Sequence, residues 1–189
     1  SSRSVRSRVN RTLRKKGVQI ILNRAIKQIN SESVIFDGGE RLEADLVILA
    51  TGATAPPLLK ELGLPLSEKG FLLTDATLQS VSSAPIFAVG DTGTIQGEET
   101  PKAGVYAVRQ APILWENIQR LVKDQPLRTY HPQHSFLRLL NTGDGSAIGE
   151  WFGFSMEGKW VLSLKDRIDT AFVKKYQIPP LPQNRRASS

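Results

Sequence analysis

The sequence contains no cysteine. Disulfides, thiolate metal sites and a redox-active cysteine pair are therefore excluded within these 189 residues. This absence is typical of intracellular proteins, and we expect a cytoplasmic one. No apolar run approaches the roughly 18 residues that a membrane-spanning helix needs. We therefore expect a segment that is soluble or, at most, peripheral at a membrane.

Acidic residues are missing from the start of the chain. Nine lysines and arginines precede the first acid, Glu32. The rest of the chain contains the other 16 of the 25 basic residues and all 18 acidic ones. The net charge of +7 thus belongs to one segment. On a helix that ends near Gly17, Val5, Val9 and Leu13 share one stripe, which is the ordinary pattern of a solvated helix lying on a domain. The alternative for this helix is binding of nucleic acid or of a phosphate-bearing ligand; of the two, no nucleic-acid partner is expected.

The chain begins Ser1-Ser2-Arg3 without an initiator methionine. We therefore expect it to be the C-terminal part of a longer protein.

Hydrophobic periodicity and turn residues predict an alternation of strands and helices. A short helix is predicted from Pro56-Pro57 to Gly63, and a long one over 102–121 with a kink or break at Pro112. After a change of character at 124–126, a β-meander with turns at 143–145 and Glu157-Gly158 and a last helix at 166–176 are predicted. Pro179, Pro180 and Pro182 are expected to end ordered structure. The strands are predicted at 18–22, 25–29, 33–36, 42–49, 71–74, 77–79, 136–140, 147–154 and 159–164, with a hairpin turn at 37–39.

Two uninterrupted apolar runs each end in a glycine. They are Leu46-Val47-Ile48-Leu49-Ala50-Thr51-Gly52 and Ala84-Pro85-Ile86-Phe87-Ala88-Val89-Gly90-Asp91. Such runs predict strands covered on both faces of a parallel sheet, and ligands lie beyond the carboxyl ends of such strands. Gly90 permits a sharp turn or close approach, and Asp91 can accept hydrogen bonds from a ribose or polyol. The alternative is that Gly-Asp simply ends a strand in a turn.

A helix start at Pro101-Lys102-Ala103-Gly104 is the third feature. Its uncapped amides carry partial positive charge and would stabilise negative charge on a bound ring. Lys102 either lies beside that ring or an acceptor, or is a solvated lysine. The predicted cofactor-binding residues are Thr51, Gly52, Gly90, Asp91, Lys102, Ala103 and Gly104.

These motifs resemble those of the two-dinucleotide-binding-domain flavoproteins, also called FAD-dependent pyridine nucleotide-disulfide oxidoreductases. Val47-Ile48-Leu49-Ala50-Thr51-Gly52 is similar to the family's Ala-Thr-Gly strand motif, and Ile86-Phe87-Ala88-Val89-Gly90-Asp91 to its second FAD motif, whose Asp binds the ribityl chain. The stretches 101–110 and 160–169 resemble type II NADH dehydrogenase-like modules, including those fused to selenide, water dikinase.

The resemblance implies an α/β fold, in which part of a doubly wound FAD/NAD(P)-binding domain precedes a small antiparallel meander with a C-terminal helix. Residues 1–44 would be the tail of the NAD(P)-binding domain, 45–122 the second segment of the FAD-binding domain, and 123–189 the meander and helix. The whole protein would use FAD and NAD(P)H and pass electrons from nicotinamide through flavin to an acceptor such as a quinone. The alternative is a noncatalytic, flavoprotein-derived interaction module with a basic anion-binding helix.

The chain departs from the family in lacking any Gly-x-Gly-x-x-Gly fingerprint. The glycine-rich stretch 143–149 has the wrong spacing and lies in a predicted hairpin, so it is no substitute. We therefore expect the 189 residues alone to bind FAD poorly and to be inactive. No catalytic residue is assigned.

Two further features are given structural roles. His131 and His134 are too closely spaced and too poor in neighbouring ligands for a metal site, and we interpret them as linker residues. The last helix is expected to pack on the meander. The alternative is peripheral membrane contact, because type II dehydrogenases use their C-terminal regions in this way.

Overall fold

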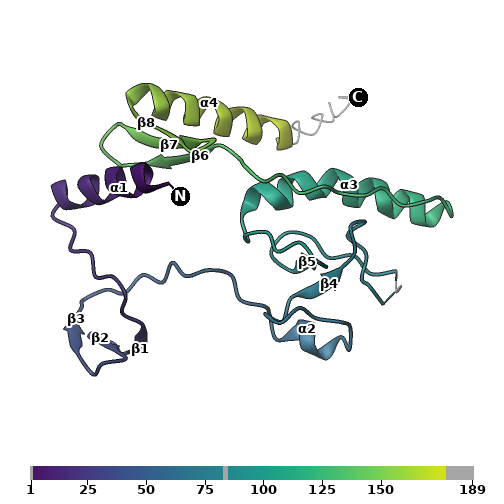
Figure 1. The fold of residues 1–189 in the computed structure, drawn as a ribbon, viewed down its shortest axis with the longest axis horizontal. Coiled ribbons are helices and arrows are strands. Elements are labelled where there is room, and N and C mark those ends of the chain that lie inside the picture. Colours follow the sequence, from purple (N-terminus) through teal and green to yellow (C-terminus); the bar gives the residue numbers. More distant parts are fainter. Residues whose placement is uncertain (1, 83–84, 178–189) are drawn as a thin grey trace, which may run out of the picture. The chain divides into compact units, whose positions relative to one another are not determined.

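The computed structural model describes residues 2–82 and 85–177 and has a mixed α/β fold, as predicted (Figure 1). The chain divides into two compact units, one made of Ser1–Arg24 with Ser135–Ser189 and the other of Ala25–His134. The first unit therefore joins the two ends of the sequence. Within the described ranges, no helix is long and apolar enough to cross a membrane.

The first unit is a three-stranded antiparallel meander with one helix on each face. Its elements are α1 (Arg3–Lys15), β6 (Arg138–Asn141), β7 (Ala147–Trp151), β8 (Phe154–Gly158) and α4 (Lys159–Tyr176), with strand order β6-β7-β8. Figure 1 shows α1 and α4 on opposite sides of this sheet, and both helices contact β7 and β8. The meander is therefore the middle layer of the unit.

Helix α1 packs on the meander through the stripe that its sequence predicts. Val5, Val9 and Leu13 are half-buried, whereas most of the basic side chains remain exposed. Polar contacts add direction to this packing. The backbone amide of Ser2 donates to Glu150 Oε1 at 2.6 Å. The prediction of a basic helix lying on a domain is thus confirmed.

The last strand of the meander lies earlier in the chain than the sequence predicts. Residues 159–164, predicted as a strand, form the first turns of α4, and the turn predicted at Glu157-Gly158 lies at Phe152-Gly153. The turn has two residues, Phe152 (φ 45°) and Gly153 (φ 83°), and both have the positive φ that a type I′ hairpin requires. This early turn pairs Phe154 with Trp151 and brings the third strand forward.

The ends of the other elements in this unit differ from expectation in smaller ways. The strand predicted at 18–22 is not formed, and Val18 and Leu22 are exposed. Helix α4 packs on the meander through the buried Val161, whereas Phe172 and Tyr176 on its later turns remain exposed. The proline-rich stretch expected to end ordered structure lies outside the described residues.

The second unit holds a hairpin sheet, a short helix, a parallel strand pair and a long helix. Its elements are β1 (Ile26–Ile29), β2 (Ser33–Phe36), β3 (Arg41–Glu43), α2 (Leu58–Glu61), β4 (Leu72–Thr74), β5 (Gly93–Ile95) and α3 (Gly104–Val122). The sheet β1-β2-β3 is antiparallel and turns at 37–39 as predicted, and β4 pairs with β5 in parallel. Helix α3 runs through Pro112 as one element, so a break into two helices does not occur.

The two long apolar runs do not form the buried strands that the sequence predicts. In 46–50, Leu46 is 77% exposed and Ile48 is 80% exposed. No strand in the described part of the chain pairs with this run, and an apolar strand is buried only when neighbours cover it. The second run is held by a single bridge between Gln79 and Phe87 instead of a continuous ladder, and Ser83 and Ala84 lie outside the described residues.

The core of the second unit joins α3 to the segments around it. Leu78, Ile95 and Tyr130 are buried together, and Ile113 of α3 packs against them. Asn117, also on α3, has no exposed surface; its amide nitrogen donates to the carbonyl oxygens of Thr77 and Arg128 at 2.8 Å each, and its Oδ1 accepts from the Arg128 backbone amide at 2.7 Å. One side chain thereby ties two loops to α3.

We expect Asn117→Leu to destabilise the chain by about 2–4 kcal/mol, because it removes three part-buried hydrogen bonds to the backbone of Thr77 and Arg128. Gln119→Leu, at an exposed position of the same helix, should change the free energy of unfolding by less than about 0.5 kcal/mol. Urea unfolding monitored by circular dichroism measures both values. Equal effects of the two substitutions would contradict this role of Asn117.

Candidate cofactor site

The Gly90-Asp91 pair forms a turn that is held from α3. Gly90 has φ +62°, and its backbone amide donates to the buried side-chain oxygen of Gln110 at 2.6 Å. A Cβ atom at Gly90 would lie 3.1 Å from the Cβ of Ala107, so the turn also approaches the helix closely. Both observations favour glycine at this position. Asp91 follows with its side chain exposed.

The start of α3 offers backbone amides without a side-chain partner. The N-cap residue, Ala103, is extended and makes no side-chain cap, and the first turn contains no acidic residue. The helix begins at Gly104, two residues later than predicted. Its first amides therefore keep the partial positive charge of a helix N-terminus.

Lys102 is anchored beside this helix start. It is half-buried, and its ammonium donates to the carbonyl oxygen of Gly93 and, at 3.1 Å, to the Thr94 hydroxyl. The same Nζ lies 4.2 Å from the centroid of the Phe71 ring. Burial lowers the pKa of Lys102, and the nearby carboxylate of Asp91 opposes that effect. Lys102 therefore fastens the helix start to β5 rather than extending freely into solvent.

A small hollow of about 160 Å³ lies next to Lys102. Ala53, Phe71, Thr94 and Lys102 are among the residues that line it. Ala53 directly follows Thr51-Gly52, which is exposed and not in a strand. The structure thus brings the residue after the first motif to the same hollow as the helix start, whereas Thr51 and Gly52 themselves are not buried against it.

Five of the seven predicted residues lie in one neighbourhood. Gly90 and Asp91 are joined to α3 through Gln110, and Lys102, Ala103 and Gly104 form the start of that helix. Sequence reasoning did not assign Gln110. Its spacing of three residues from Ala107 places both on one helical face, and a glutamine on the face that packs inward is the signal that could have found it.

The basic helix belongs to the other unit, and His134 lines a pocket with Pro101 and Tyr106 beside the start of α3. Arg8 and Arg11 of α1 both bind Glu157 Oε2, at 2.8 and 2.7 Å, and the hydrogen bond from Arg8 is the main cause that holds the pKa of Glu157 below its usual range. His131 lies 3.3 Å from the Thr129 hydroxyl. No group of residues in the described part of the chain is arranged to hold a metal ion.

Residues 1–111 match the family described as pyridine nucleotide-disulphide oxidoreductase. Human ferroptosis suppressor protein 1 is 29% identical over 191 aligned positions, which cover 94% of this chain and 50% of that protein. The type II NADH:quinone oxidoreductase of Haemophilus influenzae is 26% identical and is covered over 35% of its length. The chain therefore spans about half or less of the curated relatives it matches. These matches do not bear on the predicted likeness to kinase-fused modules.

Solved structures share the fold. An FAD-dependent pyridine nucleotide-disulphide oxidoreductase from Desulfovibrio vulgaris is 26% identical, with a TM-score of 0.59 over 79% of this chain and 38% of that one. The sulfide:quinone oxidoreductase of Aquifex aeolicus superposes with a TM-score of 0.70 over 89% of this chain and 44% of that one, at 20% identity. The second likeness is one of fold alone.

We expect Gln110→Leu to accelerate hydrogen exchange of the Gly90 amide by about fivefold, because the loss of a net hydrogen bond is worth about 1 kcal/mol. Gln110→Glu keeps an acceptor at the same place and should retain the protection. Gln119→Leu provides a control at an exposed position of α3. Amide exchange followed by NMR measures all three, and unchanged protection in Gln110→Leu would contradict the assigned contact.

We expect Lys102 to lose its proton at lower pH than Lys69, whose pKa is raised by its hydrogen bond to Glu99. A folded-state pKa below the unfolded value of 10.5 means that protonated Lys102 opposes folding. Stability should therefore rise as the pH increases through the folded pKa toward 10.5, and Lys102→Met should abolish this contribution. NMR titration of the lysine side chains measures the order, and the reverse order would contradict the burial of Lys102.

Proposed function

The chain belongs to the pyridine nucleotide-disulphide oxidoreductase family, and we propose that the whole protein is an FAD-dependent NAD(P)H oxidoreductase that passes electrons to an acceptor such as a quinone. The observation that carries the proposal is the Gly90-Asp91 turn, locked by Gln110 beside the uncapped start of α3. The name of one relative supports the same activity, since the Haemophilus influenzae protein is called a type II NADH:quinone oxidoreductase.

The residues present suit a flavin nucleotide. Asp91 is an exposed carboxylate on a rigid turn, and a carboxylate accepts hydrogen bonds from the hydroxyl groups of a ribityl chain. The close approach of Gly90 to Ala107 leaves no side chain between the turn and the helix. When bound, FAD would supply the hydride and electron transfer.

The start of α3 would stabilise the reduced form of that cofactor. The amides after Ala103, which no N-cap side chain bonds, favour negative charge nearby, and such charge develops on a flavin ring as it is reduced. Lys102 holds this helix start against β5 through Gly93 and Thr94, so its contribution is positional. None of these residues needs to act as a general acid or base.

The proposed domain assignment follows from the family. Residues 1–44 would belong to the NAD(P)-binding domain, 45–122 to the FAD-binding domain, and 123–189 to the C-terminal meander and helix. In the whole protein, the exposed run 46–50 would be covered by strands and helices from the part that this chain does not span. Burying Leu46 and Ile48 would be favourable at about 25 cal/mol for each Å² of apolar surface.

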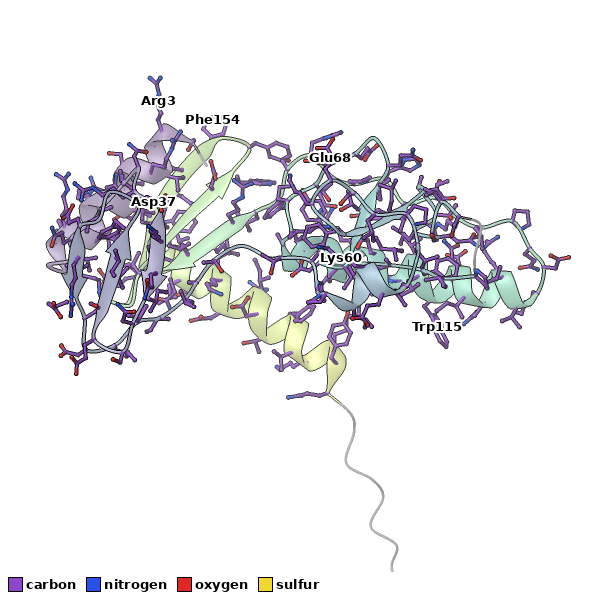
Figure 2. All side chains as sticks on the ribbon, turned by 90° about the horizontal axis from the view of Figure 1, so that it is seen from below. Arg3, Asp37, Lys60, Glu68, Trp115 and Phe154 are labelled. Carbon is purple, nitrogen blue, oxygen red and sulfur yellow. The ribbon has the colours of Figure 1, made fainter. Side chains whose placement is uncertain are left out.

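We expect the whole protein to be yellow as purified and its flavin absorbance to be bleached by NADH or NADPH. Asp91→Ala should weaken FAD binding by about tenfold or more, the loss expected for a hydrogen bond to a charged group. Asp37→Asn, on the exposed β2–β3 turn labelled in Figure 2, is the matched control and should bind FAD normally. Absorbance spectra and FAD titration provide the measurements.

A colourless whole protein with intact glycine fingerprints would refute the enzyme and favour the noncatalytic interaction module. The 189-residue chain alone should not retain FAD. Stoichiometric FAD in that chain would show that the missing fingerprint is not required for binding.

A further inference from the structure

A basic hollow runs along the outer face of α1. It has a volume of about 710 Å³ and is open to solvent. Five basic residues line it, and we call them the basic stripe: Arg3, Arg6, Arg11, Arg14 and Lys15. Figure 2 shows Arg3 projecting away from the helix. Among the described residues that line the hollow, none is acidic or apolar. The hollow therefore gathers five cations on one helical surface.

The spacing of the lining residues follows the helix. Arg3, Ser7, Asn10 and Arg14 recur at the three- and four-residue intervals that place side chains on one helical face. At a rise of 1.5 Å for each residue, the basic stripe extends about 18 Å along the helix axis. Ser7 and Asn10 are exposed, and both can donate hydrogen bonds between the cations. The hollow is thus a continuous surface of donors.

The positive charge of the basic stripe is not neutralised within the fold. The first acid in the chain is Glu32, so α1 contains none. From the meander, the single carboxylate of Glu157 pairs with both Arg8 and Arg11, at 2.8 and 2.7 Å. Across residues 2–82 and 85–177, the other four members of the basic stripe form no ion pair. The stripe therefore needs an anion from outside the chain to balance it.

The chemistry of the hollow narrows the kind of anion. Val5, Val9 and Leu13 are half-buried where α1 packs on the meander, so they offer no apolar face for insertion into a bilayer. The lining has no aromatic ring on which nucleic-acid bases could stack. It also lacks the apolar or aromatic anchors on which protein interfaces are centred. Guanidinium forks with neutral donors between them suit phosphate oxygens.

We propose that the basic stripe binds an extended, soluble oligophosphate. A single phosphate group is too short to reach both ends of a stripe of about 18 Å, whereas a chain of linked phosphates can meet all five cations. The proposal does not depend on the flavin assignment, because α1 and the candidate cofactor site belong to different units.

The test titrates the whole protein, followed by calorimetry, with long-chain inorganic polyphosphate, tripolyphosphate and inorganic phosphate. We expect the affinity to fall in that order, because shorter anions meet fewer members of the basic stripe. Added salt should weaken the binding of polyphosphate, since the cations are exposed. Absence of polyphosphate binding, or equal affinity for all three anions, overturns the proposal.

Two other polyanions distinguish the class of ligand. Polyglutamate carries carboxylates without phosphates, and single-stranded DNA carries phosphates together with bases. We expect both to bind more weakly than polyphosphate at equal charge. If polyglutamate binds as tightly, the stripe is a surface for acidic proteins; if the DNA binds as tightly, it is a nucleic-acid surface. Either result overturns the proposal.

The double variant Arg3→Gln with Arg6→Gln separates binding from folding. Both arginines are exposed, and glutamine is nearly as good a helix former as arginine, so the Tm should be unchanged. The affinity for polyphosphate should fall by about fivefold or more, as expected from the loss of two exposed ion pairs. Arg3→Lys with Arg6→Lys keeps the charge but removes the guanidinium forks, and its affinity should be intermediate.

A charge-matched control locates the site. Lys60→Gln with Lys123→Gln removes the same charge from exposed positions of the other unit, where Figure 2 labels Lys60. This variant should bind polyphosphate as tightly as the unchanged protein. If it loses as much affinity as the variant at Arg3 and Arg6, net charge alone attracts the anion and the proposal is wrong. Unchanged affinity in the variant at Arg3 and Arg6 has the same meaning.

Discussion

The candidate site depends on the hydrogen bond from the Gly90 amide to Gln110. The apolar residues around it can hold α3 against the strands, but apolar contact has no direction and does not set the rotation of a turn. A buried side-chain oxygen that accepts a hydrogen bond from one particular backbone N–H does set the rotation of the turn, because leaving that N–H unpaired is unfavourable. The orientation of Asp91 follows from this bond. Asn117 performs the same task two turns further along α3, where it fixes the loops around Thr77 and Arg128.

Lys102 completes this arrangement at the start of the helix. Its ammonium satisfies the carbonyl of Gly93 and the hydroxyl of Thr94, so that β5 and the first turn of α3 cannot separate without leaving these groups unpaired. The helix is thus fastened at three points by polar side chains that point inward. Its N-terminal amides, which no N-cap side chain bonds, are held in a fixed place, which is what a site for developing negative charge needs.

Charge in the other unit is divided between two uses. Arg8 and Arg11 bind Glu157 and hold α1 on the meander, whereas Arg3 and Arg6 line an open hollow along α1. A count of basic residues cannot separate these uses, because it does not say which side chains meet an acid from a strand more than 140 positions away. The excess charge therefore serves both packing and an exposed surface.

The sequence by itself determined the local elements and the family. The stripe of Val5, Val9 and Leu13, the hairpin turn at 37–39 and the long helix over Pro112 follow from periodicity and turn chemistry, which act over a few residues. Tertiary structure decided the rest. The run 46–50 is exposed because burial of a strand depends on partners that its own residues cannot supply, and the meander turn lies at Phe152-Gly153 because pairing with β7 selects it. The partner of Gln110 was likewise decided by the fold, since the sequence does not show which backbone amide comes within 2.6 Å of its side chain.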